Sequence, residues 1–423
     1  MQRIFKYTKA QESDYVFTTL LIFSGMLIVF AFITATPAEI FKGMIVILTE
    51  PARLVTDYME LAGIGAAFFN SGILMLFSIF LLKMLHLPFT GMSVSCCFLM
   101  GGFALFGKNP FNVLPILCGA WLYSLYRKEK FSKYIYIALF GTTLSPIVTE
   151  MSLAAAQWKG IFRLAFPLVV GILIGFVLPG ISAYTLRVHQ GYNLYNVGFA
   201  AGMVGVVLVS MLKSFGNEYS TRLLWSSGNN LVLGVFLFLI FGVMILLGWY
   251  CNDKSFKGVV HITRHSGRTI ADFIVMDGYP VTLMNMGIVG AFSTAFVILS
   301  GGALNGPTIG GIFTIVGFGS FGKHMKNIIW VMLGAVIATA LSVRNISEPA
   351  VLLAVLFSTG LAPIAGHYGP MWGIVAGMMH AWVVLNVGGI FGGLNLYNNG
   401  FAAGLVCIVL LPLIQSLRKE DGR

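Results

Sequence analysis

Charged residues are scarce in this chain of 423 residues. Asp, Glu, Lys and Arg together make up 10% of it, whereas soluble domains carry about 25%. So few charges cannot cover the surface of a soluble protein of this length, which excludes that class. Hydrophobic residues make up 57% of the chain, and the mean hydropathy is +0.88. The sequence therefore predicts a protein embedded in the lipid bilayer.

Cysteines are few, and catalytic motifs are missing. The five cysteines show neither CxxC nor mixed Cys/His ligand spacing, so we predict no disulfide framework, no metal and no cofactor. The chain also lacks a Gly-x-Ser-x-Gly elbow, a phosphate loop and a His-Glu-x-x-His motif, the short patterns that carry hydrolytic or nucleotide chemistry. We therefore expect that the protein is not an enzyme.

Acidic residues are fewer than basic ones, 15 against 26, which gives a formal net charge of +11. No arginine-rich arm or aromatic platform accompanies this excess, so we expect no nucleic-acid partner. Basic residues instead gather between apolar segments, where they hold the cytoplasmic side of a membrane protein. This pattern predicts a multi-pass protein of the cell membrane, the inner membrane of a bacterium, with both termini cytoplasmic. The basic residues that support this orientation lie at 127–133, 254–268, 323–326 and Arg418-Lys419.

What the chain does contain is an internal duplication. The stretch Gly191–Gly205 returns as Gly393–Cys407 with eleven of fifteen positions identical. Residues 41–120 match a second copy at one fixed offset, 256 − 41 = 215, and the final motif matches at 393 − 191 = 202. We therefore divide the chain into a first repeat, 1–228, and a second repeat, 229–423. Repeats with an odd number of spans lie upside down to each other in the membrane, as in many transporters.

Each repeat offers seven apolar segments long enough to cross or enter the bilayer. The sequence thus predicts an all-α membrane protein, a polytopic bundle of about 12–14 spans in two inverted repeats. Segments 88–107 and 305–322 are rich in glycine and open near a proline, so we expect them to be re-entrant or broken helices. Amphipathic stretches at 44–62 and 259–277 are expected to be surface helices, on which Arg53 pairs with Asp57 and Arg268 pairs with Asp272.

An Asn-x-x-Asn motif stands near the end of both repeats, just before a Gly-Phe-Ala-Ala-Gly sequence. Carboxamides offer donors and an acceptor, and burying them unpaired is costly. In one interpretation, the asparagine side chains of the motif line a path for a small polar solute. In the other, they cap the last span of each repeat. Both interpretations stay open. The substrate-path candidates from this motif are Asn193, Tyr195, Asn196, Asn395, Tyr397 and Asn398.

A second group of candidates surrounds the two glycine-rich segments. Proline and glycine there permit a broken helix whose end faces the midplane, and phenylalanines in a repeated Gly-Phe-x-x-Phe-Gly-Lys pattern either narrow a pore or pack. The lysines that end this pattern, Lys108 and Lys323, are expected to reach the two membrane surfaces. The path candidates from these segments are Thr90, Phe103, Phe106, Asn305, Thr308, Phe318 and Phe321.

Two resemblances follow from these motifs. The run Ala303–Leu341 resembles the pore-helix pattern of urea transporters, and Gly393–Val406 is similar to their Asn-Gly segment. This resemblance implies a duplicated, inverted fold with one re-entrant helix in each half. The duplicated layout as a whole resembles an uncharacterised family of bacterial multipass membrane proteins, which implies no substrate.

Ionisable residues inside apolar segments are functional candidates by default. Glu150 and its repeat counterpart His367 could form a proton-linked pair, and His380 lies within another span. We predict a channel or transporter that moves a small polar solute between the repeats. The alternatives are a proton- or sodium-coupled transporter that uses these three residues, and a non-transporting membrane enzyme or scaffold. A homo-oligomer is left open.

Overall fold

The computed structural model describes residues 8–216, 222–268 and 271–417, and these are helices joined by turns. Ten helical segments of the described chain are long and apolar enough to cross a membrane, and two of them, Ile135–Gln157 and Pro349–Tyr368, each join shorter helices through 3-10 turns. The prediction of an all-α polytopic bundle is confirmed, and the chain is a multi-pass membrane protein. The prediction of cytoplasmic termini uses Arg418 and Lys419, which lie outside the described residues.

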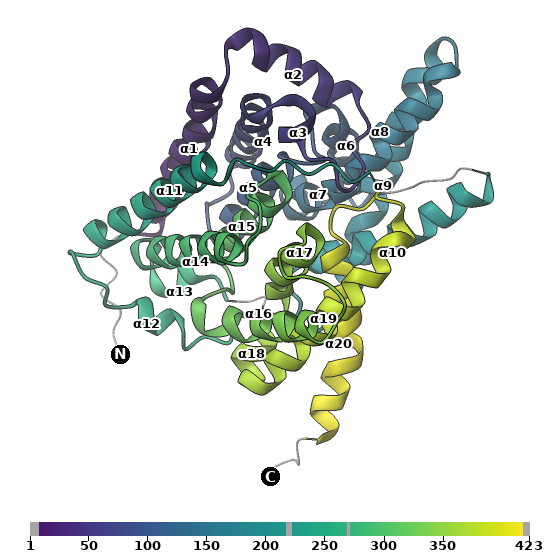
Figure 1. The fold of residues 1–423 in the computed structure, drawn as a ribbon. Helices are drawn as coiled ribbons and strands as arrows, with labels where there is room; N and C mark the ends of the chain where they lie inside the picture. The colour runs from purple at the N-terminus through teal and green to yellow at the C-terminus, as the bar shows by residue number, and fades with distance from the viewer. Residues whose placement is uncertain (1–7, 217–221, 269–270, 418–423) are drawn as a thin grey trace.

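The first repeat begins with a long helix and ends with the helix that carries its Asn-x-x-Asn motif (Figure 1). Three short 3-10 turns interrupt it at Phe131–Lys133, Thr142–Leu144 and Ala155–Gln157. Its helices are α1 (Lys9–Thr34), α2 (Pro37–Thr49), α3 (Tyr58–Ala62), α4 (Ile64–Met84), α5 (Gly91–Phe103), α6 (Pro110–Tyr126), α7 (Ile135–Gly141), α8 (Ser145–Ala154), α9 (Ile161–Val188) and α10 (Asn196–Ser214).

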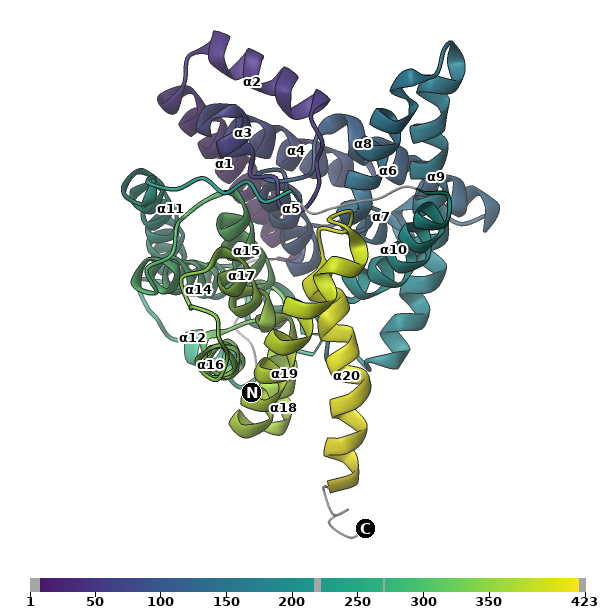
Figure 2. The same ribbon diagram turned by 45° about the vertical axis from the view of Figure 1, so that its right-hand side comes forward.

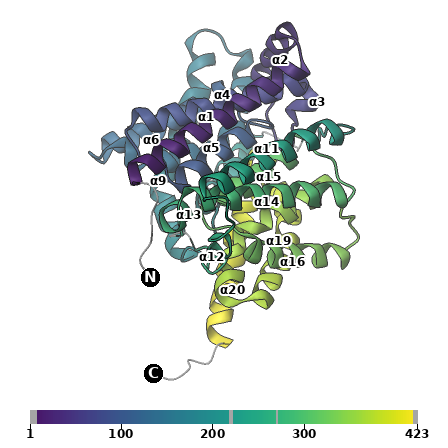
Figure 3. The ribbon, with the colours of Figure 1, turned by 90° about the vertical axis from the view of Figure 1, so that its left-hand side faces the viewer.

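The second repeat gives the same order of elements, with 3-10 turns at Thr359–Leu361 and Gly388–Phe391. Figure 3 shows its pair α11 and α14 beneath the pair α1 and α4 of the first repeat. Its helices are α11 (Asn230–Cys251), α12 (Val259–Ile262), α13 (Phe273–Asp277), α14 (Tyr279–Leu299), α15 (Gly306–Phe318), α16 (Met325–Ala340), α17 (Pro349–Ser358), α18 (Ala362–Tyr368), α19 (Pro370–Val387) and α20 (Asn398–Leu417).

The two glycine-rich segments form short helices at the centre of the molecule. Helices α5 and α15 have 13 residues each, about 20 Å at 1.5 Å per residue, whereas the hydrocarbon core is about 30 Å thick. They pack against each other so closely that a Cβ on Gly102 would lie 3.2 Å from Gly310 Cα. The Ser95 hydroxyl also donates across this contact to the Gly317 carbonyl at 3.0 Å. Helices too short to cross the bilayer therefore meet inside the fold.

The final motifs of the two repeats also meet. A Cβ on Gly198 of α10 would lie 3.2 Å from Gly400 Cα of α20, and one on Gly404 would lie 2.2 Å from the Phe199 ring. In Figure 2, α20 runs alongside α19 and extends beyond it. Small residues allow this close approach of helices, as is common in membranes.

The predicted amphipathic helices are shorter than expected, and the predicted pairing on them is wrong. Residues 50–57 are irregular between α2 and α3, so Arg53 and Asp57 share no helical face. The Arg53 guanidinium instead donates to Glu150 Oε2 at 2.6 Å. In the second repeat, the Arg268 guanidinium donates to the Gln190 carbonyl at 2.6 Å. Neither stretch forms the one continuous helix that would place residues four apart on the same face.

The change of offset between the repeats has a structural cause. In the first repeat, Gly119 of α6 lies against the backbone of Ile172 in α9. In the second repeat, Gly334 of α16 lies against the backbone of Ile374 in α19. Ile172 and Ile374 are therefore equivalent positions, and their offset is 374 − 172 = 202. The extra residues of the first repeat therefore lie before position 172, at the tip of the hairpin between α8 and α9. Figure 1 shows this hairpin projecting from the body of the molecule.

Candidate functional site

An aspartate from each repeat holds the start of the short central helix of the other. Asp57 accepts hydrogen bonds from Gly306 N–H at the start of α15 and from the Ser226 N–H and hydroxyl, at 3.2, 3.0 and 2.7 Å. Asp272 accepts from Gly91 N–H at the start of α5 at 2.9 Å. Burial raises the pKa of Asp57, and the hydrogen bonds from Ser226 oppose that rise. The helix N-termini, which attract negative charge, are thus fixed by the opposite repeat.

An asparagine in each repeat holds the end of the same helices. Asn70 of α4 donates to the carbonyls of Ala104 and Lys108 at 2.6 and 2.9 Å. Asn285 of α14 makes the equivalent bonds in the second repeat, to Gly319 at 2.7 Å and Lys323 at 2.9 Å. These bonds satisfy carbonyls that the end of a helix leaves free, and they place both lysines near the centre.

The prediction that the two lysines reach the membrane surfaces is wrong. Lys108 and Lys323 are both fully buried, and the side-chain nitrogen of each donates to a tyrosine of the other repeat's final motif. Lys108 Nζ lies 2.8 Å from the Tyr397 hydroxyl, and Lys323 Nζ lies 2.5 Å from the Tyr195 hydroxyl. Lys323 Nζ also donates to the Thr359 hydroxyl at 2.9 Å. Among the described residues, neither lysine forms an ion pair with a carboxylate.

The predicted phenylalanines surround these lysines. Lys108 Nζ lies 5.3 Å from the Phe103 ring centre, and Lys323 Nζ lies 5.1 Å from that of Phe318. Aromatic faces attract cations at such distances. Phe106 packs on Phe103 with ring centres 4.9 Å apart. The structure thus brings the phenylalanines, tyrosines and lysines of both repeats into one buried layer.

A cavity of about 320 Å³ opens beside Tyr195. The first repeat supplies its walls from α5, α7 and the junction of α9 with α10, and the second repeat supplies Phe318, Phe321 and Tyr397. Most of the lining is apolar, with the tyrosine hydroxyls, Ser182 and Asn196 as its polar groups. It has the character of a small-molecule site, a mainly apolar space with few polar groups.

The equivalent space beside Tyr397 is nearly closed. Its lining includes Phe103, Phe357, Leu396 and Gly400, the repeat counterparts of residues that line the larger cavity. Its volume is only about 10 Å³. The same positions of the two repeats therefore enclose an open space on one side and a closed one on the other.

The two Asn-x-x-Asn motifs differ in how their amides are satisfied. Asn196 accepts from the Thr185 hydroxyl at 2.8 Å and donates to the Ser182 hydroxyl at 2.9 Å, and His189 Nε2 lies 2.9 Å from its oxygen. In the second motif, the buried oxygen of Asn398 has no hydrogen-bond partner among the described residues. Of the two cavities beside the tyrosines, as lined by the described residues, the larger one has an asparagine of this motif in its lining, Asn196, and the smaller one does not.

The first asparagine of each motif shapes its turn. Asn193 accepts from Tyr195 N–H at 2.9 Å and donates to the Gly400 carbonyl at 3.1 Å. Asn395 accepts from Tyr397 N–H at 3.0 Å, but its amide nitrogen is buried without a partner in the described chain. These bonds orient the tyrosines toward the lysines.

The remaining path candidates serve as helix caps. Asn305 accepts from Thr308 N–H at 3.0 Å, and the Thr308 hydroxyl lies 2.8 Å from Asn305 N, which forms a capping box at the start of α15. Thr90 occupies the equivalent cap of α5. These contacts stabilise the starts of the two helices, a structural role that is consistent with residues of this type at these positions.

The coupling candidates are spread over the molecule. Glu150 contacts Arg53 rather than His367, whose ring packs against Tyr192 and Tyr368. His380 is buried in α19, with Nε2 3.3 Å from the Asn399 carbonyl. The structure therefore does not form the predicted Glu150–His367 pair.

Asp57, Asp272 and Thr359 were not among the residues predicted for the site. The aspartates recur at the fixed offset of 215, and that repetition is the signal that could have marked them. Thr359 gave no such signal, because its place beside Lys323 depends on how the repeats interlock.

Comparison with protein families shows the family of the chain. A family model described as a protein of unknown function, DUF1576, matches residues 36–214 and 251–416. The chain therefore belongs to this family, and the match falls on both repeats. Comparisons with curated proteins and with solved structures find no match.

Proposed function

We propose that this DUF1576 protein is a membrane transporter that exposes a central site alternately to the two sides of the bilayer. The observation that carries this proposal is the unequal pair of spaces, about 320 Å³ beside Tyr195 and about 10 Å³ beside Tyr397. Transporters built from two inverted repeats work by moving one repeat against the other around a fixed site. A channel needs both spaces open at once, so the inequality favours a transporter over a channel.

The two buried lysines indicate the chemistry of the solute. A buried ammonium group is costly unless an opposite charge or strong acceptors accompany it, and here the partners of Lys108 and Lys323 are neutral hydroxyls. A small polar solute with an acidic group or a strong hydrogen-bond acceptor would complete this arrangement. Tyr195 and Tyr397 border the larger cavity, so the solute would first meet these hydroxyls.

The proposal can be tested by uptake into liposomes that contain the purified protein. A panel of small solutes would include neutral amides and polyols, amino acids and short carboxylic acids. For a solute that is taken up, Lys323→Met and Lys108→Met should each reduce uptake at least about tenfold, because a hydrogen bond to a charged group is worth about 1.5–3 kcal/mol.

Lys133→Met is the matched control, since Lys133 is exposed and pairs with Glu129 on the membrane-flanking loop. It should leave uptake unchanged. Full uptake by the doubly substituted Lys108/Lys323 variant, with the variant still folded and monodisperse, would remove the lysines from the mechanism. Flux that rises linearly with solute concentration, without saturation, would favour a channel.

A proton- or sodium-coupled mode is the second candidate, and Glu150 favours it. Its side chain is 3% exposed and pairs with Arg53, while Oε1 has no partner among the described residues. Ionisable groups buried inside apolar segments are common at the ion pathways of transporters. Under this mode, uptake requires a gradient, and Glu150→Gln abolishes that requirement or the uptake itself.

A further inference from the structure

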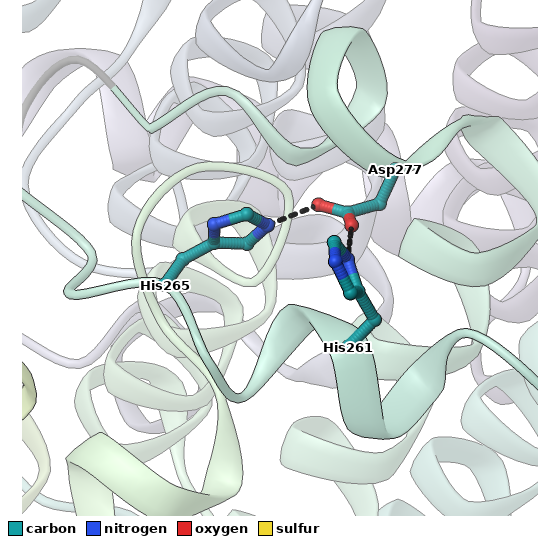
Figure 4. A group of neighbouring side chains, drawn as sticks. All are labelled: His261, His265 and Asp277. Carbon is teal, nitrogen blue, oxygen red and sulfur yellow. Dashed lines mark hydrogen bonds and ion pairs between the residues drawn. The ribbon is translucent and has the colours of Figure 1, made fainter. Parts of the chain in front are cut away.

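A cluster of metal-ligating side chains lies away from the central site, in the connection between α11 and α14. Figure 4 shows the rings of His261 and His265 directed at the carboxyl group of Asp277 from two sides. His261 Nδ1 lies 2.5 Å from Asp277 Oδ1, and His265 Nε2 lies 2.8 Å from Oδ2. The three ligand atoms all lie within 4.8 Å of one another.

The local backbone explains why these three side chains meet. His261 lies on α12, and the following turn is held by Arg264 N–H donating to the His261 carbonyl at 3.0 Å. This turn brings His265, four residues later, to the same side. Asp277 is the last residue of α13, and Gly278 turns the chain into α14 with a φ of +91°. Only glycine adopts such a conformation without strain.

We propose that His261, His265 and Asp277 bind a divalent transition-metal ion, for which Zn²⁺ is the best suited. Zn²⁺ accepts imidazole nitrogen and carboxylate oxygen at about 2.0–2.2 Å. The present nitrogen–oxygen separations are hydrogen-bond lengths, so the ligand atoms would move apart by less than about 1 Å to admit the ion. Each histidine already directs one ring nitrogen at the carboxylate, which orients the ligands before binding.

The exposure of the cluster suits an ion that arrives from solution. The Asp277 side chain is 3% exposed and that of His265 is 18% exposed, whereas that of His261 is 53% exposed. The ion would enter past His261 and keep water as its remaining ligand, as open zinc sites do. The buried carboxylate would supply the negative charge that holds it.

This site belongs to the second repeat alone. At the fixed offset of 215, the first repeat has Val46, Glu50 and Ala62 at these positions. The sequence predicted no metal because the chain shows no cysteine-containing ligand spacing, and Asp277 joins the histidines only through the fold. His324 Nε2 lies 3.0 Å from the His265 carbonyl, so an ion here would also steady the segment next to Lys323.

The experiment is a metal titration of the full chain, purified in detergent with a tag that contains no histidine. Isothermal calorimetry with Zn²⁺ should give one equivalent bound, and Co²⁺ should give a visible absorption band that Zn²⁺ removes. His261→Gln and Asp277→Asn should each weaken Zn²⁺ binding at least about tenfold, since even the loss of an outer-shell partner costs about 10–100-fold.

His86→Asn is the matched control, because His86 is exposed on another loop and has a φ of +53° that asparagine tolerates. It should bind Zn²⁺ as the unchanged protein does. Each variant's melting temperature without metal reports whether it still folds. The proposal is overturned if the unchanged protein binds no stoichiometric Zn²⁺, or if the folded His261→Gln and Asp277→Asn proteins bind it equally well; the cluster would then be a hydrogen-bonded contact only.

Discussion

The two halves of the central site have the same residues at their core but differ in what surrounds them. Beside Tyr195 lies a cavity of about 320 Å³, whose neighbour Asn196 is fully engaged in hydrogen bonds. Beside Tyr397 the space is only about 10 Å³, and the Asn398 side-chain oxygen has no hydrogen-bond partner in the described part of the chain. Duplicated sequences therefore supply the layout twice, while a few divergent neighbours make the copies unequal.

Those neighbours can be named. Ser182, Thr185 and His189 satisfy Asn196 in the first repeat. At offset 202 the second repeat has Val384, Val387 and Phe391 in their places, which offer no side-chain hydrogen bond. The second asparagine of the motif is therefore held by side-chain hydrogen bonds in the first repeat but not in the second, and we expect the segment around Asn398 to rearrange more easily.

The largest difference in stability is expected between alanine variants of Asp57 and Asp272, the two aspartates that hold the helix of the opposite repeat. Asp57 is fully buried and accepts four hydrogen bonds, including those from Met59 and Gly306. Asp272 accepts a similar set, from Gly91, Val275, Ile274 and the Thr90 side chain, but it is only partly buried. Hydrogen bonds to charged groups are worth about 1.5–3 kcal/mol each, less when exposed. Asp57→Ala should therefore lower the free energy of unfolding by about 3 kcal/mol or more, and Asp272→Ala by about 1–2 kcal/mol.

Thermal unfolding in detergent measures this difference through the two melting temperatures. An equal loss for both variants would mean that the two caps are energetically symmetric despite their different contacts.

The open and closed spaces should differ in their access to reagents. Phe140 lines the larger cavity, and its repeat counterpart Phe357 lines the smaller one. With the native cysteines replaced, Phe140→Cys should react with a small water-soluble thiol reagent at least about tenfold faster than Phe357→Cys, which corresponds to about 1.4 kcal/mol. Labelling rates by mass spectrometry give the ratio. Equal rates would contradict the unequal spaces on which the transporter proposal depends.

Some features of the fold and of the central site can be predicted from the sequence, and others depend on tertiary contacts. The order of the apolar segments and the short helices after Pro88 and near Pro307 follow from hydropathy and repetition. The burial of Lys108 does not, because a lysine next to an apolar run is compatible with either a surface or a tertiary partner. Its partner Tyr397 lies 289 residues away, and only the fold joins them.

A smaller difference in stability is expected between alanine variants of Asn196 and Asn398. Asn196→Ala leaves the Ser182, Thr185 and His189 groups without their partner, and each unsatisfied buried group costs about 1–3 kcal/mol. Asn398→Ala removes an oxygen that has no partner among the residues with described positions, so its cost should be about 1 kcal/mol or less. The paired melting temperatures test this. A larger loss from Asn398→Ala would show that its amide makes a contact more important than those of Asn196.

The smallest effect is expected from a substitution that gives Asn398 a hydrogen bond like the one that Asn196 receives. Thr185 precedes Asn196 by eleven residues and donates to it at 2.8 Å, and Val387 precedes Asn398 by the same number. Val387→Thr keeps the size of the side chain and adds a hydroxyl that can reach the free oxygen of Asn398. One neutral hydrogen bond contributes about 0.5–1.5 kcal/mol, so the variant should melt slightly higher, and the gain should vanish in Val387→Thr combined with Asn398→Ala. A loss of stability in the single variant would mean that the last turns of α9 and α19 present different faces to their asparagines, and that the second motif cannot be made like the first by one residue.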